Sequence, residues 1–137
     1  SKMFQNGLRA TGYAAEDFDW SRDQGGTVLN AEECWYKSLA PMMDQIRETI
    51  GPDTPAYLTF DIDGLDPSVA PGTGTPEPGG LTASQGLEII RGCYGLNLVG
   101  CDLMEVSPPY DTTGNTSLLA ANLLFEMLCS LPGCIRR

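Results

Sequence analysis

The 137-residue sequence contains no histidine, no C-x-x-C pair and no apolar run long enough to cross a membrane. Small zinc sites use Cys and His at short spacings, so a zinc site of that kind is excluded. Basic residues are scarce, with 8 Lys and Arg against 18 Asp and Glu and a formal charge of -10. This balance excludes nucleic acid and anionic membranes as expected partners and suits a small cationic substrate or metal ions.

Cysteine usage indicates the compartment. Five cysteines are an odd number, and their spacing fits no disulfide framework. We therefore expect reduced, mostly buried thiols in an intracellular protein, and the sequence does not decide between mitochondria and cytoplasm. The first residues lack a signal-peptide core, and the length fits one domain.

One acidic stretch organises the chain, Y-L-T-F-D-I-D-G-L-D-P at residues 57–67. It begins as a short apolar strand and ends in acids. Because residues i and i+2 of a strand point to the same side, Asp61 and Asp63 are predicted to aim two carboxylates into one volume. A hard divalent cation relieves their repulsion, since carboxylate oxygens are its preferred ligands.

Two other interpretations of this stretch stay open at this point. A D-x-D pair also occurs in solvated turns and N-cap clusters. A calcium loop of the EF-hand type requires Gly at its sixth position and Glu at its twelfth. Here Gly64 is fourth from Asp61 and Gly72 is twelfth, so the EF-hand spacing fits badly.

The remaining pattern predicts alternating strands and helices. Strands are expected near residues 3–9, 27–30, 57–60 and 98–106, and residues 12–26 are expected to form a loop with one helical turn. Helices are expected over 38–50, 82–93 and 116–131, the last apolar nearly all round and so deeply packed or covered by a partner subunit. The caps we expect are Ser38, a T-x-x-Q box of Thr82 and Gln85, and Thr116 or Ser117.

Strand–helix–strand order indicates a parallel sheet between helix layers. Right-handed crossovers then bring the carboxyl ends of neighbouring strands to one edge of the sheet. Glu105 ends the strand at 98–106 and is expected to join Asp61 and Asp63 there, although a turn-capping role for Asp102 or Glu105 stays open. The segment 68–80 is rich in Pro and Gly and follows the acids directly, so it is interpreted as a stiff wall of the site in preference to a linker.

The stretches F-D-I-D-G-L-D-P-S-V-A-P-G-T-G-T-P-E-P-G-G-L-T and C-D-L-M-E-V-S-P-P-Y-D resemble the ureohydrolase family of arginases and agmatinases, over residues 7–132. The chain is most similar to agmatinases and guanidinobutyrases. The resemblance implies a three-layer α/β/α fold with a mainly parallel sheet and a site for two Mn2+ ions. It implies metal ligation by Asp61 and Asp63, guanidinium binding by Glu105, and a wall formed by Thr73, Gly74 and Thr75.

The resemblance covers only a C-terminal half. The family's G-G-x-H and D-A-H-x-D motifs are missing, and with them four of the usual six metal ligands and every histidine. Residues 1–137 are therefore expected to be a single partial ureohydrolase domain, inactive alone and homo-oligomeric when complete. No catalytic residue is assigned within it. The alternative is a non-catalytic oligomerisation or regulatory fragment of the same fold.

The resemblance also bears on the substrate. Arginases carry acids directly after the G-L-R strand, where they meet the α-amino group of arginine. Here Gly7-Leu8-Arg9 is followed by Ala10-Thr11-Gly12. We therefore expect hydrolysis of a linear guanidine without an amino-acid head, agmatine or 4-guanidinobutyrate, to urea and an amine.

Overall fold

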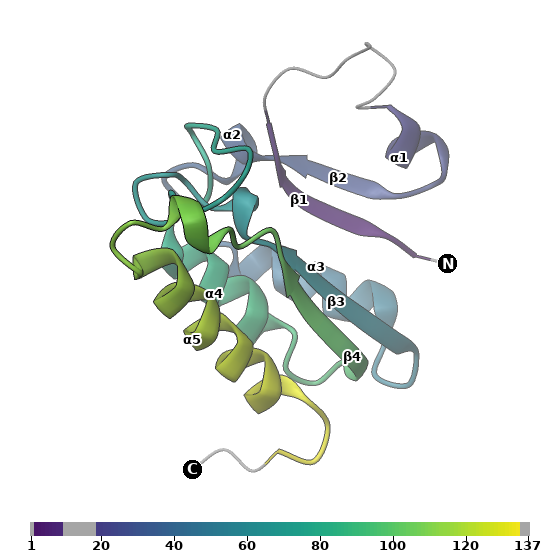
Figure 1. The fold of residues 1–137 in the computed structure, drawn as a ribbon. Coiled ribbons are helices and arrows are strands. Elements are labelled where there is room, and N and C mark those ends of the chain that lie inside the picture. The colour runs from purple at the N-terminus through teal and green to yellow at the C-terminus, as the bar shows by residue number, and fades with distance from the viewer. Residues whose placement is uncertain (1, 10–18, 135–137) are drawn as a thin grey trace.

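Two pairs of parallel strands form the frame of the computed structural model, which describes residues 2–9 and 19–134 (Figure 1). Strand β1, Phe4–Leu8, pairs with β2, Thr27–Asn30. Strand β3, Pro55–Asp61, pairs with β4, Asn97–Met104. The predicted parallel pairing is confirmed in both pairs. The predicted loop at 12–26 falls partly outside the described residues, and its helical turn is α1, Trp20–Asp23.

Three helices pack against one face of the β3–β4 pair. They are α3, Ala40–Ile50, α4, Ala83–Gly92, and α5, Asn115–Ser130, with α4 between the other two (Figure 1). The shorter elements are α2, Ala31–Cys34, and the 3-10 turns η2, Ile62–Gly64, and η3, Pro108–Tyr110. The largest fully buried apolar side chains of the shared core are Leu39, Met43, Ile62, Leu65, Ile90, Leu123 and Met127. Along the described segments, no helix is both long and apolar enough to cross a bilayer.

The opposite face of the β3–β4 pair is open. Alternate residues of β3 point to opposite faces, and Phe60 is buried whereas Tyr57 is 62% exposed. Val99 on β4 is 66% exposed. The near-continuous apolar character of this strand predicted burial on both faces, and the structure shows burial on the helix side alone.

The helix caps differ in part from those expected. Thr82 and Gln85 form the predicted capping box, with the Thr82 side chain accepting from Gln85 N and the Gln85 side chain accepting from Thr82 N. The predicted Ser38 cap is confirmed only in part: the N-cap residue of α3 is Leu39, but the Ser38 hydroxyl accepts the N–H of Ala40, the first residue of the helix, at 3.2 Å. Ser38 also donates to Glu88 on α4, across 2.5 Å, which ties the start of α3 to α4.

The start of α5 is fixed by a residue outside the helix. Gly114 is its N-cap residue, and the Asp111 carboxylate accepts the N–H groups of Thr116 and Ser117. The prediction that Thr116 or Ser117 caps this helix is therefore wrong. An acid five residues before Thr116 and six before Ser117 satisfies the free amides, which a local cap rule does not detect.

None of the five cysteines, which all lie within the described residues, forms a disulfide bond. Cys34 and Cys93 are buried, and the other three are partly exposed, so the expectation of mostly buried thiols holds for two of them. Burial raises the pKa of the Cys93 thiol to about 11, which keeps it protonated and unreactive near neutral pH.

Candidate functional site: the carboxyl edge of β3 and β4

The structure places the three predicted acids at one end of the β3–β4 pair. Asp61 is the last residue of β3 and lies opposite Met104, the last residue of β4, in the strand register. Asp63 follows within η2, and Glu105 follows Met104 directly. Because the strands are parallel, both carboxyl ends reach the same edge, where open α/β sheets bind their ligands.

The local geometry of Asp61 and Asp63 is not that of a continuing strand. The strand ends at Asp61, which becomes the N-cap of η2, and its Oδ1 accepts the N–H of Asp63 at 2.9 Å. The i, i+2 argument is therefore corrected: a 3-10 turn, and not strand alternation, sets the relation of the two acids. Both stay at the edge, since the turn is only three residues long.

The loop that follows the acids folds back onto Asp63. The two carboxylate oxygens of Asp63 accept hydrogen bonds from the hydroxyl groups of Thr73 and Thr75, one each. Thr73 is buried and forms a β-bridge with Val106, just beyond Glu105. The segment 68–80 is therefore held against the edge that bears Asp61, Asp63 and Glu105, called the acid edge below. This is the arrangement expected of a wall of the site and not of a linker.

Glu105 has an unusual backbone conformation. Its φ is +67°, in the left-handed region that side chains other than Gly rarely adopt. The strand predicted over 98–106 therefore ends earlier, at Met104, and Glu105 turns away from the strand direction. Such conformations concentrate at functional sites, where surrounding structure maintains them.

The charges at this edge influence one another. Partial removal of water raises the pKa of Asp61 above its ordinary value, and the negative charges of Asp63 and Glu105 raise it further. The bond from Asp63 N and the positive charge of Arg9 oppose this rise. The negative charges of Asp63 and Glu105 therefore act on Asp61, and a cation beside Asp61 would relieve this repulsion.

The donor set is too small to make a manganese site by itself. Mn2+ is typically held by about six ligands, largely oxygens. Within residues 2–9 and 19–134, no group of three or more His, Cys, Asp or Glu side chains could hold a metal ion. Asp61 and Asp63 supply carboxylates, and both oxygens of Asp63 already accept from threonines. The residues present fit part of a manganese site and not a whole one.

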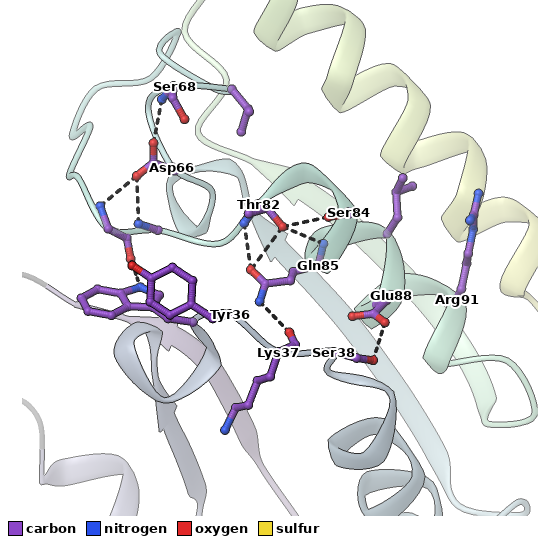
Figure 2. Close-up of a pocket in the computed structure, with 15 residues that line it drawn as sticks. Tyr36, Lys37, Ser38, Asp66, Ser68, Thr82, Ser84, Gln85, Glu88 and Arg91 are labelled. Carbon is purple, nitrogen blue, oxygen red and sulfur yellow. Dashed lines mark hydrogen bonds between the residues drawn. The ribbon is translucent and has the colours of Figure 1, made fainter.

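Asp66, the third acid of the stretch, lies apart from the other two. Its carboxylate accepts the N–H groups of Ser68 at 2.9 Å, Gly79 at 2.8 Å and Gly80 at 3.2 Å (Figure 2). Hydrogen bonds from Ser68, with smaller contributions from the two glycines, lower its pKa to about 2. Asp66 therefore closes the base of the loop through Gly79 and Gly80, and its bond to the Ser68 N–H forms an Asx turn.

A groove of about 990 Å³ lies beside this loop base, away from the acid edge. Trp35, Tyr36 and the start of α4 line it, and Figure 2 shows Asp66 at one end and Arg91 at the other. The Trp35 indole N–H donates to the Gly79 carbonyl at 2.9 Å, which fixes the wall of the groove to the loop. Asp61, Asp63 and Glu105 are not among its lining residues.

The fold and this edge together define an α/β protein whose parallel strands end in acids under a Pro- and Gly-rich loop. Residues 1–129 match the model of the arginase family. The chain belongs to that family, and the predicted resemblance is confirmed.

Relatives of known name agree with this assignment. The chain is 69% identical to a guanidinobutyrase of Pseudomonas aeruginosa over 99% of its own length and 42% of the relative's. It is 62% identical to a mitochondrial agmatinase of Gallus gallus, over 97% of this chain and 39% of that one. Among solved structures, proclavaminate amidino hydrolase of Streptomyces clavuligerus superposes with a TM-score of 0.84 at 42% identity, over 92% of this chain and 42% of that one. The arginase-like α/β fold is thereby confirmed, and the chain spans about two fifths of the length of the curated relatives it matches.

Proposed function

We propose that this chain supplies the C-terminal part of a manganese-dependent amidinohydrolase that cleaves agmatine or 4-guanidinobutyrate to urea and an amine. Asp61 and Asp63 are its two metal ligands, and Glu105 binds the planar guanidinium group, for which a carboxylate offers two parallel acceptors. An intracellular location, mitochondrial or cytoplasmic, and homo-oligomeric assembly of the complete enzyme belong to the same proposal.

One observation carries the proposal: the register that sets Asp61 opposite Met104 brings Glu105 to the edge that bears Asp61 and Asp63. Partial burial, together with the negative charges of Asp63 and Glu105, raises the pKa of Asp61, and a bound cation would offset this repulsion. The names of the similar proteins, guanidinobutyrase and agmatinase, support a guanidine as the substrate. A net charge of -10 favours a cationic guanidine over an anionic substrate.

The chain alone is proposed to be inactive. Its described residues offer no cluster of three metal-binding side chains, and the sequence holds no histidine to move a proton. The residues of this chain orient the substrate and one metal ligand. Glu105 receives the guanidinium group, and Thr73 and Thr75 fix the Asp63 carboxylate. Activity then requires the remaining ligands from another polypeptide segment.

The test is complementation. The purified 137-residue chain is assayed for urea release with Mn2+ and each guanidine, first alone and then mixed with the N-terminal segment of the Pseudomonas aeruginosa guanidinobutyrase. We expect no turnover alone and measurable urea release from the mixture. Enzymatic turnover by the chain alone would contradict the incomplete site.

Matched variants connect any regained activity to the proposed residues. Glu105→Gln in the mixture should abolish urea release, because an amide gives up one of the two acceptors and the charge. Glu88→Gln is the control, since Glu88 lies on α4 and bonds to Ser38 and Leu39, away from the acid edge. Equal urea release by Glu105→Gln and Glu88→Gln would contradict the proposed role of Glu105 in binding the guanidinium group.

The second candidate is a non-catalytic oligomerisation or regulatory fragment. The absence of a three-ligand group among the described residues favours it. It predicts that the two segments of the mixture bind each other but release no urea. Co-elution of the two segments without urea release would therefore select this candidate.

A further inference from the structure

The Arg9 side chain reaches from the end of β1 to the loop that covers the acid edge. Its Nη2 donates to the Asp63 carbonyl at 2.7 Å, the Leu65 carbonyl at 3.2 Å and the Glu77 carbonyl at 2.5 Å. Its Nε donates to the same Glu77 carbonyl at 2.9 Å, and Nη1 to the Gly7 carbonyl at 3.4 Å. Each of these bonds ends on a main-chain carbonyl, so the guanidinium holds backbone in place.

The partners of Arg9 lie at both ends of one loop. Asp63 and Leu65 come immediately before it, and Glu77 comes near its return to the base. These carbonyls are 54, 56 and 68 residues away from Arg9 in the sequence. A planar guanidinium can bridge acceptors that a single ammonium group cannot span, because its donors point in fixed, different directions.

A bulge in β1 accompanies this placement. The register with β2 shifts between Asn6 and Leu8, and Gly7 has φ +86°. A Cβ at Gly7 would meet the Leu81 side chain at 3.3 Å, so the strand end lies close against the far end of the loop. Bulges of this kind occur next to active sites and re-aim the following side chain. Here Arg9, two residues after Gly7, is the side chain that reaches the loop.

The held loop carries the two threonines that bind Asp63. Thr73 and Thr75 lie between the points that Arg9 ties down, and their hydroxyl groups donate to the Asp63 carboxylate. Arg9 also fixes the carbonyl of Asp63 itself. Arg9 and the loop that it holds therefore fix both the main-chain carbonyl and the side-chain carboxylate of Asp63.

We propose that Arg9 is a positioning residue, whose guanidinium joins both ends of the loop to β1 and so keeps Thr73 and Thr75 on the Asp63 carboxylate. The functional meaning of this role rests on the proposed function, in which Asp63 is a metal ligand. The contacts themselves do not depend on catalysis. They can therefore be tested on the 137-residue chain without metal or substrate.

The experiment measures the methyl chemical shifts of Thr73 and Thr75 by NMR in the native chain and in Arg9→Met. Asp63→Asn serves as the reference for weakened threonine bonds. We expect Arg9→Met to move both methyl signals toward their positions in Asp63→Asn. We also expect amide exchange at residues 73–75 to quicken about tenfold or more, as the loss of a charge-assisted hydrogen bond implies.

Arg91→Met is the matched control, because it removes an arginine whose bonds go to Glu126 on α5. Arg9→Lys keeps the charge but not the planar fork, and its threonine signals should stay displaced. Unchanged threonine signals in Arg9→Met, equal shifts in Arg91→Met, or full restoration by Arg9→Lys would each overturn the proposal.

A measurement on the native chain decides the case in which Arg9→Met fails to fold. The Nε–H of Arg9 should exchange with water about tenfold or more slowly relative to free arginine, because it is bonded to Glu77. Exchange at the rate of free arginine would overturn the proposal. Failure of the complementation assay, by contrast, would leave these NMR results unchanged and would count against the proposed function alone.

Discussion

The Oδ1 atom of Asp61 accepts the main-chain N–H of Asp63 at 2.9 Å. This bond turns the chain from β3 into η2 immediately after the strand ends. One carboxylate is thereby engaged by the backbone, and the other by Thr73 and Thr75. Two acids separated by one residue therefore have different surroundings, which a symmetrical D-x-D motif does not suggest.

The loop over the acid edge provides a matched pair of glycine substitutions. A Cβ at Gly72 would lie 2.5 Å from the Asp111 Cβ and 2.9 Å from its Cα, whereas nothing lies within 4 Å of a Cβ at Gly74. Gly72→Ala should reduce the free energy of unfolding by about 1–3 kcal/mol through overpacking. Gly74→Ala should be neutral or stabilising by up to about 1 kcal/mol, because Ala restricts the unfolded chain. Urea denaturation measures both, and equal effects would contradict the packing described.

The last helix allows the core and the surface to be compared on one element. Leu123 is fully buried and Leu118 is 71% exposed, both on α5. Leu123→Ala should cost about 2–5 kcal/mol by loss of burial and creation of a cavity. Leu118→Ala should change the free energy of unfolding by less than about 0.5 kcal/mol in the monomer. A large loss at Leu118 would instead indicate that the exposed side of α5 is covered in solution.

The stability of the loop base should depend on pH through Asp66. The folded chain lowers its pKa from 3.8 to about 2, so the carboxylate stabilises the fold above about pH 4. This contribution is lost as the pH falls from about 4 to about 2, where the folded-state carboxyl also takes up a proton. The unfolding free energy of Asp66→Asn should therefore fall less steeply across that interval than that of the native chain.

Ser68→Ala separates the parts of this effect, since it removes the Ser68 hydroxyl and keeps its main-chain N–H on Asp66. The fall in its unfolding free energy between about pH 4 and about pH 2 should be intermediate between those of the native chain and Asp66→Asn. Urea unfolding at several pH values gives all three slopes. Identical slopes for the native chain and Asp66→Asn would refute the assignment.

The left-handed conformation of Glu105 should have a measurable cost. A residue with a side chain is less stable there than Gly by about 1 kcal/mol. Glu105→Gly should therefore be more stable than Glu105→Ala by about that amount, because Ala keeps the strain and Gly relieves it. Thermal unfolding of the two variants provides the comparison, and equal melting temperatures would show that φ is not constrained at this position.

Much of the architecture followed from local sequence patterns. The T-x-x-Q box at Thr82 and Gln85 predicted the start of α4, and the structure has the two reciprocal bonds that define it. Parallel pairing followed from the strand–helix order. The cap of α5 did not follow, and that of α3 followed only in part, because Asp111 and Glu88 reach the relevant groups from outside these helices.

The sequence by itself determined the family and the order of the acids, since both are written in contiguous motifs. Only the tertiary structure decided that Asp66 closes a loop base, that Glu105 leaves its strand in a left-handed turn, and that Arg9 holds the loop. The physical reason is sequence separation. The Arg9 bonds join residues 54 to 68 positions apart, and hydrophobic periodicity reports only on neighbours within a turn or a strand.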